Sequence, residues 1–513
     1  MSTTKRLISG SAASWARIAV TMLTQLALVP IFLTYWDVKT YGIWIAIQAL
    51  VNMLSTLDRG YNDFLQYEFL KLGHDKRADI SSMLWSGVFV TALISFIELL
   101  IISVIAFQPN IGYILGISEH IGPLANQIAW ALIAQWIAWS FTSIVGLFLR
   151  SLAVFGYFPR MSWWNVILAI VTSVCPIIAV INGQSLIYAS LYSLGGTLAI
   201  LIIQFVDVNR LLKREQLGLN DFSIKNGFKE YVKSIGLSGR YFLENFRQQG
   251  IRLLLAPVAG AAGLAAFSTI RTGANVALQG LATITNPLMP ELMRFIHQRE
   301  QKKIEASFDT IWLVLIIGLA PAVLFIQTIA PELFSLWTKG QIVYDPFLFA
   351  TLSLGVLVYA WGQPAAAIVT GNNLVKVQFL ISLVSSVIVI AGIVVLVAYL
   401  NILGAGLALL AAEIVVALSF QHFAKKWLLS QSLIWPDKSS NLAFLSILIS
   451  AAGMFMIILF PFNKWFLLLF SCLLLLLNIR IYWKNMPQIA IEKAHSILTR
   501  IPVIGKIHKR FVL

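Results

Sequence analysis

Long apolar segments, each of about 20 residues, follow one another along almost the whole chain, and they constrain its fold more than any other feature. The stretch from Tyr41 to Leu57, for example, carries no charge. The 513 residues are 59% hydrophobic and 12% charged, where an average soluble domain has roughly 25% charged residues. A soluble protein of this length could not bury so much apolar surface. We therefore predict an all-α polytopic membrane protein.

Charged residues and Gly, Pro or Asn breaks divide the chain into about fourteen transmembrane spans. The predicted spans are 8–34, 41–69, 81–107, 124–149, 161–181, 185–207, 238–257, 262–291, 308–330, 347–370, 377–399, 403–424, 441–460 and 464–483. Lysine and arginine concentrate in alternate loops, so the positive-inside rule predicts that both termini are cytoplasmic. A net charge of +15 does not predict nucleic-acid binding, because the charges are spread over short loops between spans.

Two pairs of segments indicate an internal repeat. TYGIWIAI at 40–47 is similar to AAGLAAFS at 261–268, and GLFLRSLAVFGYFPRMSWW at 146–164 is similar to GQPAAAIVTGNNLVKVQFL at 362–380. Six predicted spans separate equivalent positions, so the two halves would share one topology, related by an axis along the membrane normal. We expect an N-lobe of six spans at 1–207, a basic cytoplasmic linker at 208–237, a C-lobe at 238–425, two further spans at 441–483 and a basic amphipathic tail at 484–513.

Five arginines lie inside the apolar segments, where each costs about 2.5–3.5 kcal/mol even on a lenient scale. They are Arg17, Arg59, Arg247, Arg252 and Arg271. The acids within the spans are Asp58, Glu98, Glu244 and Glu413. Asp58 is adjacent to Arg59 and so points to another helix face, while Glu244 could pair with Arg247 or Arg240. Arg17, Arg59 and Arg271 have no acid on their own face, which predicts a water-filled cavity with positive walls.

The expected ligand of such a cavity is an anion. The planar guanidinium group matches the geometry of phosphate oxygens, so a phosphate ester is favoured. Polar side chains at helical spacing would line the same cavity, namely Gln48, Asn52 and Ser55 on the second span and Asn275 and Gln279 on the eighth. The alternative is that these polar side chains join helices by hydrogen bonds. The four acids are candidates for ion coupling, or each satisfies a neighbouring helix.

Three stretches resemble a known family: YGIW…LSTLDRGYNDFLQYEF, AAGLAAFSTIRTGANVALQGLATITNPLMPELMR and AAAIVTGNNLVKVQFLISL. They are similar to the polysaccharide-biosynthesis transporters, the O-antigen and lipid-linked-oligosaccharide flippases of the multidrug/oligosaccharidyl-lipid/polysaccharide (MOP) superfamily. The resemblance implies two pseudo-symmetric six-helix lobes in a MATE-like V shape. Lipid II flippases of this superfamily use arginines in a central cavity, and Arg17, Arg59 and Arg271 look like their counterparts. Arg59 departs from the family pattern, which has a small or apolar residue at this position of LDxG.

The resemblance implies a flippase that moves a polyprenyl-pyrophosphate-linked oligosaccharide, an O-antigen or exopolysaccharide precursor, to the outer leaflet of the inner (plasma) membrane by alternating access. Membrane lipids, a polysaccharide polymerase and a chain-length regulator would be its partners. We expect no catalytic residues, no cofactor, no metal site and no nucleic-acid partner. The alternative is a cation-coupled multidrug antiporter of the same superfamily, whose cavity should favour acids over arginines.

Overall fold

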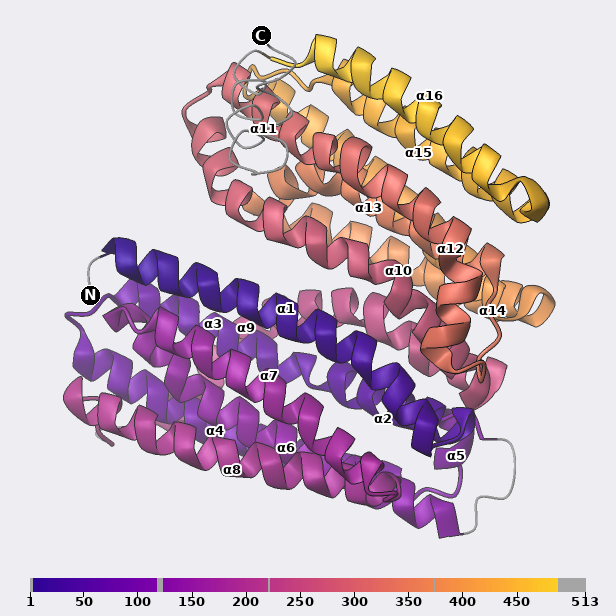
Figure 1. The fold of residues 1–513 in the computed structure, drawn as a ribbon. Coiled ribbons are helices and arrows are strands. Elements are labelled where there is room, and N and C mark those ends of the chain that lie inside the picture. Colours follow the sequence, from indigo (N-terminus) through magenta and orange to yellow (C-terminus); the bar gives the residue numbers. More distant parts are fainter. Residues whose placement is uncertain (1–2, 118–122, 220–221, 373, 488–513) are drawn as a thin grey trace. The chain divides into compact units, whose positions relative to one another are not determined.

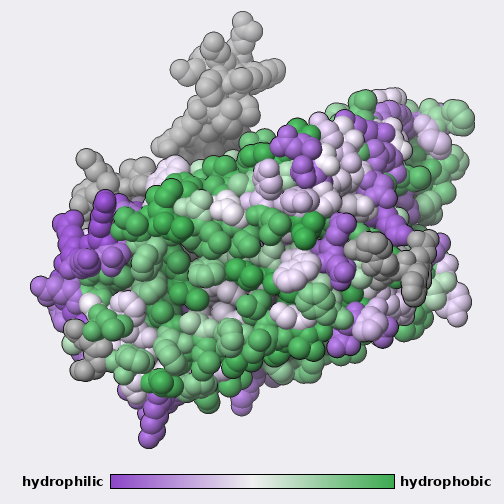
Figure 2. Space-filling model, turned by 90° about the horizontal axis from the view of Figure 1, so that it is seen from below, coloured by the Kyte–Doolittle hydropathy of each residue, from purple (hydrophilic) through white to green (hydrophobic). Residues whose placement is uncertain are grey.

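The computed structural model describes residues 3–117, 123–219, 222–372 and 374–487, and within these ranges the regular structure is entirely helical (Figure 1). Eleven helices are long and apolar enough to cross a membrane, or up to twelve if one bent pair is counted as a single span. Figure 2 shows an apolar surface over the middle of one face, with hydrophilic side chains gathered towards both ends. The prediction of an all-α polytopic membrane protein is confirmed, whereas the count of fourteen spans is not.

The chain divides into two compact units, of which unit 1 comprises Met1–Thr269 and Trp337–Val343. Its helices are α1 (Thr3–Tyr35), α2 (Val38–Leu54), α3 (Thr56–Leu72), α4 (Arg77–Ala106), α5 (Ile111–Ile114), α6 (Pro123–Ser151), the 3-10 turn η1 (Leu152–Phe155), α7 (Phe158–Ile181), α8 (Leu186–Arg214), α9 (Ile224–Asn245), the π-helical turn η2 (Phe246–Gly250) and the first part of α10 (Ile251–His297). α3 packs against α4, α6 and α9, and these contacts form the interior of the unit.

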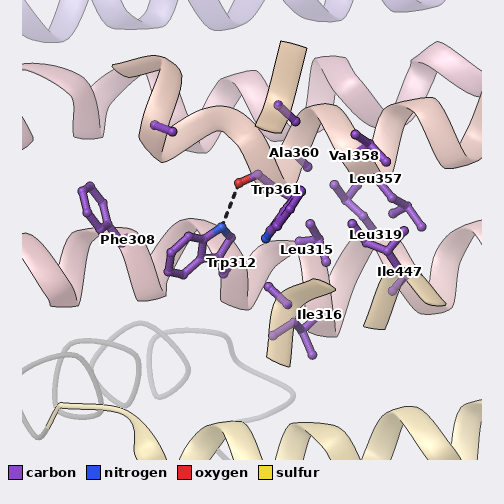
Figure 3. Packing of buried hydrophobic residues seen from close by; sticks show 14 of the residues in the cluster. Phe308, Trp312, Leu315, Ile316, Leu319, Leu357, Val358, Ala360, Trp361 and Ile447 are labelled. Atoms are coloured by element: carbon purple, nitrogen blue, oxygen red, sulfur yellow. Dashed lines mark hydrogen bonds between the residues drawn. The ribbon is translucent and has the colours of Figure 1, made fainter. Parts of the chain in front are cut away.

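Unit 2 comprises Ile270–Leu336 and Tyr344–Leu513. Its helices are the rest of α10, α11 (Gln301–Leu313), η3 (Val314–Leu319), α12 (Ala320–Thr338), α13 (Pro346–Gly371), α14 (Val375–Ser430), α15 (Asp437–Leu459), η4 (Pro461–Asn463) and α16 (Lys464–Asn485). A large aromatic and aliphatic cluster fills its interior, and Trp312 and Trp361 lie side by side within that cluster (Figure 3). The Trp312 indole donates a hydrogen bond of 3.0 Å to the Trp361 carbonyl.

The predicted span 41–69 is not one straight helix, because the structure divides it into α2 and α3 with a bend of 41°. Ser55 separates the two helices. The hydroxyls of Ser55 and Thr56 donate to the carbonyls of Asn52 and Met53, at 2.9 and 2.5 Å. Hydroxyl groups that bond back to the preceding turn compete with the helical ladder and bend helices. The bend therefore follows from two hydroxyl residues in succession.

α14 contains 56 residues, which would make it about 84 Å long if it were straight, far more than one bilayer crossing needs. Its backbone leaves the helical region at Asn401, with φ 49° and ψ −140°. A Cβ atom built on Gly404 would lie 2.4 Å from the Leu396 carbonyl oxygen, and one on Gly392 would lie 2.5 Å from the Ala408 Cβ. The two halves of α14 therefore fold back on each other, as predicted for spans 377–399 and 403–424.

The segments predicted as linker and tail have different outcomes. Most of the predicted linker 208–237 is helical, because α8 continues to Arg214 and α9 begins at Ile224. α9 packs against α3 and α4 and so belongs to the interior of unit 1. Only the first few residues of the predicted amphipathic tail 484–513 are described, and its remainder from residue 488 lies outside the described ranges.

Candidate functional site: an arginine face and a buried polar seam in unit 1

Arg17 on α1 and Arg59 on α3 both have exposed side chains. The positive charge of Arg59 acts on the Arg17 guanidinium, so the two groups lie close enough to repel one another. Neither guanidinium forms an ion pair with any residue in the described part of the chain. We call these two side chains the arginine face. Two like charges near one another, without a carboxylate partner among the described residues, are the arrangement that an anionic ligand would stabilise.

A close contact between α3 and α9 fixes the position of Arg59. A Cβ atom built on Gly60 would lie 2.3 Å from the Ser238 Oγ and 2.5 Å from its Cα, so only glycine lets the two helices approach this closely. Asn245, at the end of α9, donates to the Asn52 carbonyl at 2.6 Å and to the Thr56 Oγ1 at 2.9 Å. Gly60, the glycine of the LDRG sequence, therefore has a packing role: it lets α3 lie against α9, and this contact fixes the position of Arg59.

Asp58 is buried and Arg59 is exposed, so they lie on different faces of α3, as the sequence predicts for adjacent helical residues. Its side chain is only 2% exposed. The Ser95 hydroxyl on α4 and the Trp139 indole on α6 both donate to the Asp58 Oδ2, each at 3.3 Å. Hydrogen bonds to a carboxylate stabilise its ionised form.

The carboxyl group of Glu98 on α4 lies close enough to that of Asp58 for the two to interact directly. The Asp58 Oδ1 and the Glu98 Oε2 are both buried, and neither receives a hydrogen bond from any donor in the described structure. They are the only carboxylate oxygens of the described residues in that condition. Because two ionised carboxylates only accept hydrogen bonds, a bond between them requires a proton on one of them.

The pair belongs to a longer row of polar contacts, which we call the polar seam: Asp58, Asn62, Thr91, Ser95, Glu98, Trp139 and Ser143. Asn62, one turn beyond Asp58 on α3, donates to the Ser143 Oγ at 2.8 Å. It also accepts a bond of 3.4 Å from the Thr91 hydroxyl. Three helices, α3, α4 and α6, are therefore joined by side-chain hydrogen bonds through the interior of unit 1.

The other predicted arginines lie elsewhere. Arg252 on α10 is half-buried near Tyr41, donates to the Gln249 Oε1 at 3.1 Å, and has a buried Nε without a described acceptor. Arg271 lies in unit 2, is 7% exposed and has interaction partners. The side chain of Arg247 lies outside the described part of the structure. Among the predicted arginines with described side chains, Arg17 and Arg59 lie within range of each other's charge.

The remaining predicted residues have varied surroundings. Asn52 and Glu244 are exposed, Gln48, Asn275 and Glu413 are half-buried, Ser55 is buried, and the side chain of Gln279 lies outside the described part. Among the described residues no group of three or more His, Cys, Asp or Glu side chains could hold a metal ion. Their assignment as cavity lining or as ion-coupling residues stays a prediction.

Sequence reasoning missed the α4 and α6 partners of Asp58. Thr91, Ser95 and Glu98 recur at steps of four and three, and Trp139 and Ser143 at a step of four, which places each set on one helix face. This spacing was a usable signal. Hydroxyl residues are common in transmembrane helices, however, and spacing alone does not reveal which faces pack together.

No protein-family model and no curated relative matches the sequence. Solved structures do resemble it. The lipid II flippase MurJ in an inward closed conformation has a TM-score of 0.64 at 15% identity, over 93% of this chain and 99% of that one. An inward-facing multidrug resistance MATE family transporter of the MOP superfamily has a TM-score of 0.64 at 14% identity, over 81% and 98%.

A third similar structure is a MOP superfamily transporter from Pyrococcus furiosus, described as having a binding pocket of reverse polarity. Its TM-score is 0.57 at 12% identity, and the likeness covers 83% of this chain and 95% of that one. At these identities the likeness concerns the fold. The chain is a multi-pass membrane protein with the fold that MurJ and the MATE transporters share.

Proposed function

We propose that the protein is a MOP superfamily flippase that moves a polyprenyl-pyrophosphate-linked oligosaccharide from the cytoplasmic to the outer leaflet. The arginine face is the observation that carries this proposal. Arg17 and Arg59 repel each other and lack an acidic partner among the described residues, so an anionic ligand between them would relieve an unfavourable interaction. A pyrophosphate offers the doubly charged, oxygen-rich group that two guanidinium forks bind well.

The proposed mechanism is alternating access without covalent chemistry. The pyrophosphate binds the arginine face, the sugars follow through a polar passage lined by Gln48 and Asn52, and the prenyl chain stays in lipid. An inside-negative membrane potential favours outward movement of an anion by about 2.3 kcal/mol per charge per 100 mV, so a doubly charged head group gains about 4–5 kcal/mol. We also propose that Arg247, Arg252 and Arg271 contribute to binding. The same proposal includes two six-helix lobes and cytoplasmic termini.

The fold likeness supports a transporter, but it is equally close to a flippase and to a multidrug transporter, both at a TM-score of 0.64. A multidrug antiporter for organic cations is therefore the second candidate function. The exposed guanidinium groups of Arg17 on α1 and Arg59 on α3 favour the flippase, because their positive charge would repel a cationic drug.

The test is transport in proteoliposomes that contain the purified protein and a polyprenyl-pyrophosphate-linked oligosaccharide. We expect Arg17→Gln and Arg59→Gln each to slow flipping about 10- to 100-fold, because a hydrogen bond to a charged group contributes about 1.5–3 kcal/mol. Arg480→Gln, on the exposed face of α16, is the matched control and should flip at the wild-type rate. A folded double variant of Arg17 and Arg59 with full activity would contradict the proposal.

A deletion experiment tests substrate and direction together. Cells that lack the protein should accumulate lipid-linked repeat units on the cytoplasmic face of the membrane. Accumulation of a fluorescent organic cation, without stranded repeat units, would instead favour the multidrug antiporter.

A further inference from the structure

The polar seam of unit 1 contains a feature that pyrophosphate binding does not use, namely the Asp58–Glu98 pair. Asp58 is 2% exposed, and its Oδ2 already accepts bonds from Ser95 and Trp139. Its other oxygen, Oδ1, is buried and has no donor within the described structure, and the Glu98 Oε2 is in the same situation. A proton shared between the two neighbouring carboxyl groups would supply the donor that these buried oxygens lack.

We propose that Asp58 and Glu98 form a single proton-binding site, in which Glu98 carries the proton and donates it to the Asp58 Oδ1. The two existing donors to Asp58 favour its ionised form and so assign the proton to Glu98. Glu98 is also the less buried of the two residues, so the proton enters and leaves through it.

The surroundings of the pair favour a proton over a metal ion. Neither carboxyl group forms an ion pair with a described residue, so no lysine or arginine neutralises the pair. From the packed elements, α4 contributes Ser95, α6 contributes Trp139 and α9 contributes Tyr231, a titratable phenol that interacts with the charges of both acids. No third carboxylate or histidine joins them in the described structure to form a metal site.

Loss of the proton would leave two negative charges in contact inside the unit, and their repulsion would separate α3 from α4. Arg59 follows Asp58 on α3, immediately after the bend at Ser55, so a shift of α3 also moves the arginine face. Proton release and anion binding are therefore linked through one short helical segment. This coupling step rests on the proposed function, whereas the proton site itself does not.

The binding test is infrared difference spectroscopy of the full-length protein in lipid nanodiscs while the pH is changed. The wild type should show the carbonyl stretch of a protonated carboxylic acid at neutral pH, and the band should shift when glutamate is labelled with ¹³C at the carboxyl carbon. The labelling needs no mutation, so it is independent of any folding defect. Absence of a labelled band that titrates would overturn the proposal.

Variants locate the band. Glu98→Gln should abolish it, and Glu413→Gln, which changes a half-buried glutamate of α14, should leave it intact. Asp58→Asn should change the pH at which the band titrates, because the neighbouring negative charge is lost. A band that is lost in Glu413→Gln instead, or that sodium ions abolish at constant pH, would contradict the assignment.

The coupling test is flipping in proteoliposomes under an imposed pH gradient. We expect the gradient to change the wild-type rate and to have no effect on Glu98→Gln. Wild-type flipping that ignores the gradient would overturn the coupling step. A titrating Glu98 band in a protein that moves no lipid-linked oligosaccharide would support the proton site and contradict the proposed function alone.

Discussion

Asp58 in unit 1 and Asp309 in unit 2 are both buried aspartates, 2% and 1% exposed, but their surroundings differ. The Tyr482 hydroxyl donates to the Asp309 Oδ1 at 3.1 Å, and Ser439 provides a further hydrogen bond. Asp58 has donors on one oxygen only, and its other oxygen meets a second acid. Hydrogen bonds from Tyr482 and Ser439 let the Asp309 carboxylate join helices while it is ionised. A hydrogen bond between two carboxyl groups, in contrast, requires a proton on one of them.

The largest loss of stability should come from a substitution in the hydrophobic core of unit 2, the unit that contains Asp309. Trp312 is fully buried against Phe308 and Trp435, and Trp312→Ala removes a large side chain from that cluster. We expect a loss of about 3–5 kcal/mol in the free energy of unfolding. Denaturation in mixed detergent micelles measures it, with Tyr188→Phe on an exposed site as the control. A loss below 1 kcal/mol would contradict this view of unit 2.

The next effect concerns the helix contact that positions Asp58. Gly60→Val places a side chain where the α9 backbone lies, since even a Cβ atom would be 2.5 Å from the Ser238 Cα. Forced overpacking costs about 1–3 kcal/mol, and α3 must shift, so flipping should fall as well. Gly195→Ala on α8 is the matched control, because nothing lies within 4 Å of its added Cβ. Equal unfolding curves for the two variants would refute the close contact.

Tyr482→Phe tests how much the hydrogen bonds to Asp309 contribute to stability. The substitution removes one donor from Asp309, so we expect a loss of about 1–3 kcal/mol, the cost of leaving a buried acceptor unpaired. Tyr482 lies on α16 and Asp309 on α11, so the loss should appear as earlier unfolding of unit 2. Hydrogen exchange followed by mass spectrometry can separate the two units. Exchange that rises in unit 1 instead would go against a local role.

The smallest effect is expected for Glu98→Gln. The amide of glutamine donates a hydrogen bond to the Asp58 Oδ1, as the protonated acid does, so the free energy of unfolding should change by less than about 0.5 kcal/mol. Glu98→Leu supplies no donor and should cost about 1–3 kcal/mol. Thermal unfolding at neutral pH compares the two variants. If both lose the same stability, the carboxyl of Glu98 does not act as a donor.

Much of the membrane architecture could be predicted from apolar segments, because lipid requires long helices that satisfy their own backbone hydrogen bonds. The break at Asn401 and the different helix faces of Asp58 and Arg59 were predicted for the same kind of local reason. The bend at Ser55 was missed, since its hydroxyl bonds compete with a helix that the hydropathy pattern treats as continuous. The helical character of the predicted linker was also missed, because its charged residues resemble those of a loop.

The sequence by itself determined that this chain is a membrane protein, that arginines interrupt its apolar helices, and that Asp58 and Arg59 lie on different helix faces. These properties depend on residues near one another in the chain, where helical periodicity specifies direction. Only the tertiary structure decided that Ser95 and Trp139 donate to Asp58, that Glu98 interacts with it, and that the charge of Arg59 acts on Arg17. Periodicity specifies the face of a helix, but the partner of that face is set by how three or four helices pack together.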